Sequence, residues 1–522
     1  MKKIFVPFFI LFSLHSFAQQ IPMEYNLEPK RLAKTSDQTP ASNTIERILI
    51  KDNMIFLATS EGLSTSTNNG DSWTNHIFGT ENVSSVGYND GIIWAATWHM
   101  ENLIGSDVPV GTGLRYSSDA GVTWLEIPQP VDAPGDSTIT YGVNKLRALP
   151  ITVRPGNFIY DIAFTKNTIW IVTYYGGLRK STDLGKTWQR VVLPPDNLNS
   201  IKPTDVLKFD LSPSSGALGF QNNLNHRAFS ILAVDDNTLY VGTAGGINKS
   251  TDGGVSWVKF NHTNQSKPIS GNFILALEKN DFDNSIWVGT WKAEGQTEFW
   301  GVSVSIDGGQ SWENYLSGEK TRDFGFKYFG TPGNYSGVDI FAATETGVYR
   351  SSNNGITWIA SPEIKDDNTN VSINTKRFLS VKINKRIDNS DDIWLGSSNG
   401  LARLNETSGF WTGRWKVFLA SEKLASVSET YAFPNPFSPD AERIKIKYST
   451  TEAAAVTIRI LDFGMNLVRT VIQNVQRAAN KEHLDIWDGR DEAGRIVPNG
   501  VYFYRIDIGS GTPLFGKIMV MM

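Results

Sequence analysis

The sequence repeats one twelve-residue pattern seven times, and this repeat limits the possible fold more than any other feature. Its clearest copy is GINKSTDGGVSW at residues 246–257. Each copy begins with Gly and ends with Trp, and successive copies start 46 to 69 residues apart. Repeats of this length are typical of units that bury their apolar faces only by stacking against one another. The other copies are residues 62–73, 113–124, 177–188, 301–312, 347–358 and 400–411.

Six of the copies share polar residues that are typical of a tight turn. A Ser lies seven residues before the Trp, an Asp or Asn five before it and a Gly three before it. A short Asp or Asn side chain can accept hydrogen bonds from backbone N–H groups one or two residues further on, and Gly provides a positive φ. A calcium loop needs several oxygen ligands, so we predict structural turns and no metal. The turn residues are Asn68, Asp119, Asp183, Asp252, Asp307 and Asn353, and the Trp residues expected to be buried are Trp73, Trp124, Trp188, Trp257, Trp312 and Trp358.

A second repeat, of strand type, precedes the turn pattern in every unit. In the third unit, a first strand at 158–164, a second at 169–173, a third at 178–181 and a last strand that carries the Trp are predicted. Four-stranded units at this spacing predict a seven-bladed β-propeller, and the protein is expected to be all-β. The seventh copy keeps Gly400 and Trp411 but has Leu404, Glu406 and Ser408 at the other positions. The second-strand runs are residues 55–59, 93–97, 169–173, 239–243, 286–290, 340–344 and 393–397.

The repeated turn resembles the Asp-box, or BNR repeat, of the sialidase and sortilin type, Ser-x-Asp-x-Gly-x-Thr-Trp. The resemblance covers seven hairpins and implies a propeller whose boxes lie at the blade rims, away from the functional site. Sialidases add an arginine triad and an early Arg-Ile-Pro motif, and the nearest match here is Val153-Arg154-Pro155. The xyloglucanase type pairs two propellers around a cleft and uses two carboxylates, whereas one propeller is predicted here.

The composition excludes several classes of site. Lys and Arg number 49 against 53 Asp and Glu, so the sequence offers no nucleic-acid surface. The His residues lie far apart without paired-ligand spacing, so we expect no zinc site and no cofactor. The chain has no Cys, so its stability must come without disulfides. After the N-terminal segment, apolar runs are too short for a transmembrane span.

The ends of the chain predict an exported bacterial protein. Residues 1–18 have the form of a secretory signal peptide, with Lys2 and Lys3, an apolar run and Ser16-Phe17-Ala18 as the cleavage site. We expect a secreted protein or one held at the outer cell surface. The polar segment 19–43 is either mobile or lends one outer strand that closes the ring. The propeller is predicted at 44–419, a linker at 420–430 and a second domain at 431–522.

The C-terminal segment has short strands that predict a small β-sandwich. It resembles the Ig-like domain of the flagellar hook-capping FlgD family and the related type IX secretion sorting domains. This resemblance implies export across an outer membrane, with the secretion machinery as a partner of the tail. The matching residues are Pro434-Asn435-Pro436-Phe437, Trp487-Asp488-Gly489-Arg490-Asp491 with Gly494, Asn499-Gly500-Val501-Tyr502 and Lys517-Ile518-Met519-Val520.

Insertions between strands indicate where a ligand would bind. In an antiparallel blade, the connections from second to third strand and from fourth strand to the next blade open on one face, here called the loop face. The repeated turns open on the opposite face, here called the turn face. We expect the insertions 98–112, 128–157, 193–227, 291–300 and about 317–336 on the loop face, where functional residues often occur. The predicted ligand-binding residues are Trp98, Tyr174, Tyr175, Trp291 and Trp300, with Phe324, Phe326, Tyr328, Phe329 and Tyr335 nearby; the alternative is that these rings only pack loops onto the blades.

Two functions of different classes remain open, and a purely structural surface protein is a third. The first is a non-catalytic propeller that binds a protein or polysaccharide ligand through the loop face. The second is a glycoside hydrolase or lyase that uses two carboxylates on the same face. The pattern Gly396-Ser397-Ser398-Asn399-Gly400 matches a nucleophile elbow, but it aligns with an ordinary turn. No spacing selects a catalytic pair among Asp107, Asp132, Asp136, Asp205, Asp210 and Asp323.

Overall fold

The computed structural model describes residues 39–213, 222–368, 371–386, 390–420, 424, 426–439 and 443–522. The predicted signal peptide, most of the 19–43 segment and part of the 420–430 linker lie outside the described residues. Within these ranges the fold is almost entirely β, and its single helical element is the 3-10 turn Leu224–His226. No helix among the described residues is long and apolar enough to cross a membrane.

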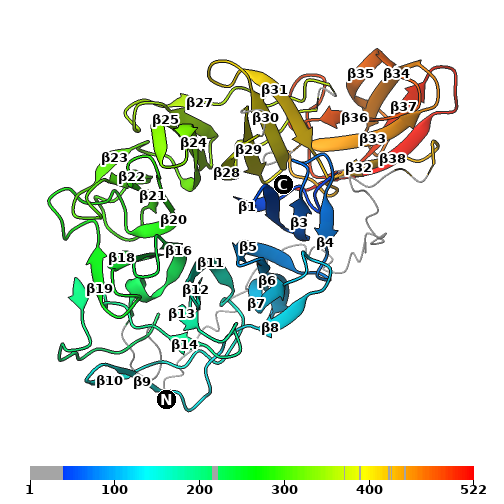
Figure 1. Cartoon of the computed structure of the whole chain (residues 1–522). Helices are drawn as coiled ribbons and strands as arrows, with labels where there is room; N and C mark the ends of the chain where they lie inside the picture. The colour runs from blue at the N-terminus through cyan, green and yellow to red at the C-terminus, as the bar shows by residue number, and fades with distance from the viewer. Residues whose placement is uncertain are drawn as a thin grey trace, which may run out of the picture. The chain divides into compact units, whose positions relative to one another are not determined.

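The described strands from residue 45 to 418 form seven antiparallel blades around a common axis (Figure 1). The strands nearest the axis are β1 (Ile45–Lys51), β5 (Asn82–Asn89), β11 (Ile159–Thr165), β16 (Ala228–Ala233), β20 (Phe273–Lys279), β24 (Thr321–Thr331) and β28 (Phe378–Lys385). The second strands are β2 (Met54–Thr59), β6 (Ile92–Leu103), β12 (Thr168–Thr173), β17 (Leu239–Thr243), β21 (Ile286–Trp291), β25 (Asn334–Thr344) and β29 (Asp391–Ser397). The prediction of seven blades is confirmed, and every predicted second-strand run lies inside its strand.

The third and fourth strands flank the repeated turns. The third strands are β3 (Gly62–Ser66), β7 (Ser106–Ser117), β13 (Gly177–Ser181), β18 (Gly246–Ser250), β22 (Gly301–Ser305), β26 (Val348–Ser351) and β30 (Gly400–Glu406). The fourth are β4 (Thr74–His76), β8 (Leu125–Pro128), β14 (Gln189–Arg190), β19 (Trp257–Phe260), β23 (Glu313–Tyr315), β27 (Ile359–Ala360) and β31 (Gly413–Phe418). Only β19 among these carries the Trp of the pattern. The prediction was wrong for the other blades, where the Trp still belongs to the turn.

The repeated turns are held by a recurring set of hydrogen bonds. In the second blade, Asp119 Oδ1 accepts from Ser117 Oγ at 2.7 Å and from the backbone N–H of Thr123 at 2.9 Å. The Ser117 hydroxyl in turn accepts from Gly121 N at 2.8 Å. The Asp119 carboxylate therefore accepts from the backbone N–H four residues further on, whereas a partner one or two residues further on was expected. Asn68 and Asn353 make the same contacts with an amide oxygen.

The Gly of the turn pattern has a second role, in packing between blades. Gly254 has a φ of +80°, and a Cβ there would lie 2.5 Å from Trp170 Cη2 in the preceding blade. Gly70 has the same relation to Trp394 across the junction of the first and last blades. Of the turn Trp residues, Trp73, Trp257 and Trp312 are buried, and Trp124, Trp188 and Trp358 are half-buried.

The ring closes without an exchanged strand among the described residues. All four strands of the last blade come from residues 378–418, and β1 packs directly against β28. Ile48 N donates to Ser380 Oγ at 3.0 Å across this junction, and Asn43 Oδ1 accepts from Ala420 N at 2.8 Å. Ala41 N donates to Ser64 Oγ in the first blade at 2.8 Å, so residues 39–43 connect the first and last blades through hydrogen bonds and contribute no outer strand.

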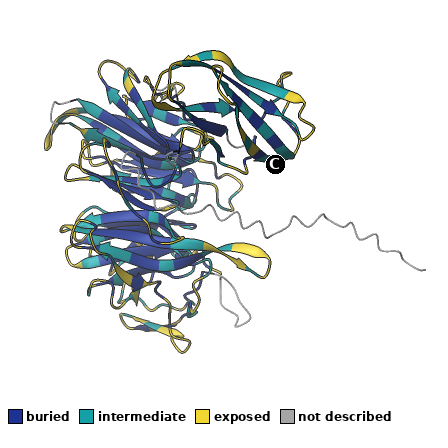
Figure 2. Cartoon of the chain, turned by 90° about the vertical axis from the view of Figure 1, so that its right-hand side faces the viewer, coloured by how far each residue is buried: buried dark blue, intermediate teal, exposed yellow. Residues whose placement is uncertain are grey.

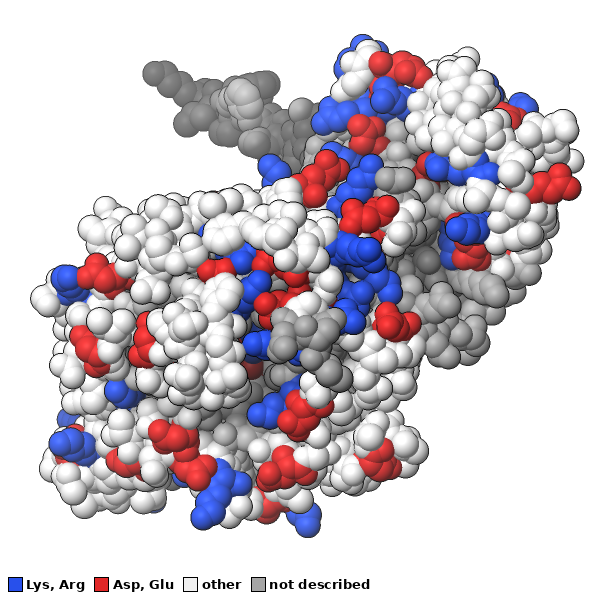
Figure 3. All heavy atoms as spheres, turned by 45° about the horizontal axis from the view of Figure 1, so that its top comes forward, with Lys and Arg blue, Asp and Glu red and all other residues white. Residues whose placement is uncertain are grey.

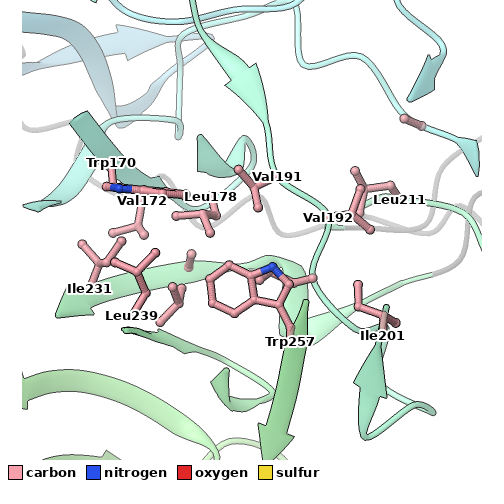
Figure 4. Packing of buried hydrophobic residues seen from close by; sticks show 14 of the residues in the cluster. Trp170, Val172, Leu178, Val191, Val192, Ile201, Leu211, Ile231, Leu239 and Trp257 are labelled. Carbon is pink, nitrogen blue, oxygen red and sulfur yellow. The ribbon is translucent and has the colours of Figure 1, made fainter. Parts of the chain in front are cut away.

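The central parts of the insertions 128–157 and 193–227 do not lie on the loop face as expected, whereas their ends meet the loop-face turns, where Asn157 Oδ1 accepts from Gly176 N and Thr243 Oγ1 donates to Asn225 Oδ1. Their strands β9 (Thr138–Tyr141) and β10 (Asn144–Arg147) form a hairpin, and β15 (Ser200–Ile201) pairs with β19 at the outer edge of the fourth blade. The Tyr141 hydroxyl donates to Val255 O, in a repeated turn, at 2.8 Å. Apolar side chains of these insertions, including Ile201 and Leu211, join the core around Trp257 (Figure 4). Burial of this apolar surface directs both insertions to the blade edge.

The predicted loop-face position of residues 317–336 was also wrong. Most of this segment belongs to the hairpin of β24 and β25, whose tip extends toward the turn face. The Tyr328 hydroxyl accepts from Asp281 N at 2.8 Å, and Asp281 follows β20 on that face. The aromatic side chains on this hairpin, Phe324, Phe326, Tyr328, Phe329 and Tyr335, therefore belong to the core or the turn face.

The C-terminal residues form two further sheets with one shared core. The sheets have the orders β32-β33-β36 and β35-β34-β37-β38. Trp487, Tyr448 and Ile458 are buried in this core. Most buried residues lie in the strands, and many of the exposed residues lie at the turns (Figure 2). The strands are β32 (Tyr431–Phe433), β33 (Ile444–Thr450), β34 (Ala454–Leu461), β35 (Leu467–Arg477), β36 (Lys481–Trp487), β37 (Gly500–Ile508) and β38 (Leu514–Val520).

Candidate functional site

Each of the seven described innermost strands carries a β-bulge after its first or, in β5 and β20, its second residue. A bulge leaves one residue without a partner in the ladder and redirects its side chain. Because every innermost strand begins at the loop face, the bulges form one ring at that end of the axis. The bulged residues are Glu46, Ser84, Tyr160, Phe229, Leu275, Arg322 and Leu379. Together with Arg47 and Asp323, they line a cavity of about 110 Å³.

Ionisable groups of both signs surround this cavity. Arg47 pairs with Asp161 at 3.0 Å. Lys382 pairs with Asp323 at 2.8 Å and with Glu278 at 2.7 Å. Burial raises the pKa of Glu46 above its usual value, although Arg377 and Arg322 oppose the shift. Burial therefore favours the protonated form of the Glu46 carboxyl group.

Aromatic rings at the mouth of the cavity form a continuous row, here called the aromatic arc. Tyr160 and Phe229 belong to the cavity wall, with ring centroids 5.0 Å apart. The side chain of Phe229 is buried, whereas the other rings are half-buried. The arc consists of Trp98, Phe158, Tyr160, Phe229, Phe273 and Trp291, and successive ring centroids are 5.2, 4.2, 5.0, 4.4 and 6.3 Å apart.

The residues predicted to bind ligand lie on or beside this arc. Trp98 and Trp291 are its two ends. Tyr174 contacts Phe229 at 5.9 Å and Tyr175 at 4.7 Å between ring centroids. Trp300 is 38% exposed and is connected to Trp291 through Lys320 Nζ, which lies 4.5 Å and 5.2 Å from the two ring centroids. Their role in binding stays a prediction.

The central members of the arc were not among the residues predicted to bind ligand. Phe158 and Phe273 directly precede or begin an innermost strand, and Tyr160 and Phe229 are bulged residues. Phe158 and Tyr160 fell within the first strand predicted at 158–164, and Phe229 and Phe273 were not singled out. Aligning the first residues of the innermost strands between blades would have shown that large rings recur there in blades three, four and five.

Cationic side chains border the arc. Arg322 lies 4.8 Å from the Trp291 ring and Arg227 lies 5.2 Å from the Tyr174 ring. Arg322 pairs with Glu345 at 2.5 Å, whereas no ion pair of Lys320 is found among the described residues. On the face shown in Figure 3, basic and acidic side chains are interspersed.

The carboxylates considered as a catalytic pair either lie far from the cavity or already interact with other side chains. Asp132 is buried and pairs with Arg179 at 2.7 Å, and Asp323 pairs with Lys382. Asp107 accepts from Asn102 near the tip of the β6–β7 hairpin at 2.9 Å. Asp136, Asp205 and Asp210 lie in the insertions at the blade edge. Of these residues only Asp323 reaches the cavity.

Metal coordination finds little support in the described part of the chain. No group of three or more His, Asp or Glu side chains there is placed to hold a metal ion. His226 and His262 both use their rings in hydrogen bonds to backbone or side-chain groups. The carboxylates of the repeated turns accept several hydrogen bonds each, for example those of Asp252.

These features define a seven-bladed β-propeller with an aromatic-lined cavity at one end of its axis. No family model matches the chain. It is 25% identical over 301 residues to the xyloglucanase Xgh74A of Acetivibrio thermocellus, a match that covers 56% of this chain and 27% of that protein. The chain therefore spans about a quarter of the length of the curated relatives it matches.

Solved propellers are also similar to this chain. YCF48 from Cyanidioschyzon merolae is 16% identical with a TM-score of 0.40, covering 71% of this chain and 95% of that one. The GH74 enzyme of Niastella koreensis is 13% identical with a TM-score of 0.48, covering 93% of this chain and 74% of that one.

Proposed function

We propose that this protein is a secreted or cell-surface propeller that binds a polysaccharide through its loop face. The observation that carries the proposal is the aromatic arc at the mouth of the cavity. Binding sites for small molecules and sugars are concave, mostly apolar and aromatic, with a few polar groups that orient the ligand. Glu46 and Arg322 in the cavity wall are such polar groups.

The distant relative supports a carbohydrate ligand. Its name, xyloglucanase, states that it acts on xyloglucan, and the similarity extends over more than half of this chain. A protein ligand is the other occupant to be tested, because Trp, Tyr and Arg are also the residues that dominate protein interfaces.

The test is a binding assay with the full chain. Xyloglucan, other neutral glucans and an acidic polysaccharide would be titrated by calorimetry and by affinity electrophoresis. Trp98→Ala and Trp291→Ala are each expected to cost about 2 kcal/mol, or roughly 30-fold in affinity, because each removes one end of the arc. The matched control is Phe329→Ala, which removes a 41% exposed ring outside the loop face. Wild-type binding that persists unchanged in both Trp variants would contradict the proposal, and no response to any glycan would favour a protein partner.

A glycoside hydrolase or lyase is the second candidate, and Glu46 is the observation that favours it. A carboxyl group that keeps its proton in a cavity can act as a general acid. Asp323 lines the same cavity, although Lys382 and Ser380 already bind its carboxylate. Release of reducing sugar from xyloglucan by the wild type, abolished in Glu46→Gln, would establish catalysis. Binding without product release would leave the recognition function.

We also propose that the repeated turns are Asp-boxes and that the chain is exported. Residues 1–18 would act as the signal peptide, and residues 431–522 would form an Ig-like sorting domain for type IX secretion. The two C-terminal sheets with a common core and the motif around Trp487 support this assignment. Deletion of residues 431–522 is expected to retain the protein inside the outer membrane, as measured by cell fractionation. Undiminished delivery to the surface or medium would contradict it.

A further inference from the structure

Blade three departs from a hydrogen bond that recurs in the other blades. At or near the end of the second strand, a hydroxyl donates to the carbonyl oxygen of the Gly that begins the twelve-residue repeat. Two residues separate these positions in a short turn such as Thr243 to Gly246, but three separate Thr173 from Gly177. The Thr173 hydroxyl has no partner among the described residues. The hydroxyls that keep the bond belong to Thr59, Thr97, Thr243, Thr290, Thr344 and Ser397, at 2.7 to 3.4 Å.

Other buried polar groups without described protein partners surround Thr173. They are Gln129 Nε2 and Oε1, Asn157 Nδ2, Arg179 Nε and Nη2, and His226 Nδ1. These four side chains and Thr173 are all more than nine-tenths buried. A buried polar group is costly unless something pairs with it. The concentration of these unpaired polar groups in one place indicates a bound ion or molecule with which they pair.

The glycine contacts show that these groups face one turn. A Cβ at Gly176 would lie 2.6 Å from Thr173 Oγ1 and 3.0 Å from Arg179 Nε. Gly176 N donates to Asn157 Oδ1 at 2.9 Å. A Cβ at Gly177 would lie 2.8 Å from His226 Nε2.

Gln129 joins the group from the neighbouring blade. A Cβ at Gly111 would lie 2.6 Å from Gln129 Oε1 and 2.8 Å from the Asn157 carbonyl oxygen. The polar atoms therefore gather under the turn that carries Tyr174 and Tyr175.

The charge around this turn is unbalanced. Arg179 and Arg190 share one carboxylate, that of Asp132, at 2.7 and 3.7 Å. Arg190 Nη1 is also a buried donor without an acceptor among the described residues. Burial, with the charge of Arg179, lowers the pKa of His226 to about 4, so this ring is neutral at pH 7. Unpartnered donors outnumber acceptors, and two guanidinium groups face one carboxylate.

We propose that Arg179, Thr173, Asn157 and Gln129 bind a small monovalent anion such as chloride inside blade three. An anion accepts from several N–H and O–H donors at once and offsets the excess positive charge. Water would satisfy some donors but would leave the charge unbalanced. None of these four side chains belongs to the aromatic arc, so the anion site stands whether or not the loop face binds a glycan.

The first experiment is crystallographic, on the full chain grown with bromide in place of chloride. Anomalous difference density is expected within hydrogen-bonding distance of Arg179 Nη2 and Thr173 Oγ1. Density at that position without an anomalous signal would identify water and overturn the proposal.

The second experiment measures thermal stability in chloride and in gluconate at equal ionic strength. A bound anion raises the melting temperature with concentration by linkage. Thr173→Val removes one donor at nearly constant volume and is expected to weaken chloride binding roughly tenfold. Its matched control is Thr243→Val, which removes the equivalent hydroxyl from blade four. Equal chloride responses in the two variants, or none in the wild type, would overturn the proposal.

Discussion

A buried ion cluster joins the sixth and seventh blades. Arg350 is 2% exposed and donates to Asp339 Oδ2 at 2.5 and 3.1 Å, and to both Glu406 oxygens at 2.5 and 3.1 Å. Lys327 Nζ lies 2.6 Å from Glu406 Oε2. Glu406 occupies the position of the turn Asp in the seventh copy of the repeat, and it accepts from Trp411 N at 3.0 Å. The divergent copy is thus held by an ion cluster.

The Arg350→Met variant tests how much this cluster contributes to the free energy of unfolding. The variant keeps an unbranched apolar side chain but leaves Asp339 without a charged partner among the described residues. Glu406 retains Lys327 and Trp411 N. Removing one partner of a buried ion pair costs about 3–5 kcal/mol. A further Asp339→Leu change is expected to recover about 1–3 kcal/mol, because it removes the unpaired carboxylate.

The assay is urea denaturation of the full chain, followed by Trp fluorescence at several pH values. Burial opposes ionisation of Glu406, but hydrogen bonds from Arg350 and Lys327 outweigh it and hold the pKa below 4.5. A carboxyl group whose pKa is lower in the folded than in the unfolded state stabilises the fold above its unfolded pKa. This stabilisation is lost as the pH falls through the folded-state pKa. The wild type should therefore lose stability below about pH 4.5, and Arg350→Met should lose less. A loss under about 1 kcal/mol at pH 7, or no recovery in the double variant, would refute the reasoning.

Three further outcomes are expected. In urea denaturation, Gly254→Ala should reduce the free energy of unfolding by about 1–3 kcal/mol more than Gly253→Ala. Both residues have a positive φ, but only a Cβ at Gly254 would meet the Trp170 ring. Equal losses of stability in the two variants would contradict the importance of this ring contact. Burial lowers the pKa of His226 to about 4 from 6.5, so the unfolded chain binds the extra proton first and stability should fall as the pH drops between these values. His226→Gln should flatten that fall, and an unchanged pH profile would contradict it. Lys320→Gln should weaken binding of an acidic polysaccharide more than that of xyloglucan and reduce its salt dependence, as measured by calorimetry at two salt concentrations.

Local chemistry explains why the sequence predicted the blades. The turn residues around Asp119 interact within five positions of one another, so their spacing is visible in the chain. The apolar second strands are likewise short and contiguous. Seven repetitions of both patterns require stacked four-stranded units, because a single unit cannot bury its faces. The same reasoning located Trp98, Trp291 and their neighbours on the loop face.

Contacts between distant residues decided the rest. Tyr160, Phe229 and Phe273 meet only because three innermost strands converge on one axis, and their bulges have no signature in a single sequence. The position of the insertions 128–157 and 193–227 on the propeller depended on their apolar side chains, which are buried against the outer edge of the fourth blade at β19. Strand alternation and turn chemistry are local, so the sequence by itself determined the number of blades. The aromatic arc, the cavity and the placement of the insertions arise from packing between blades, which only the tertiary structure decides.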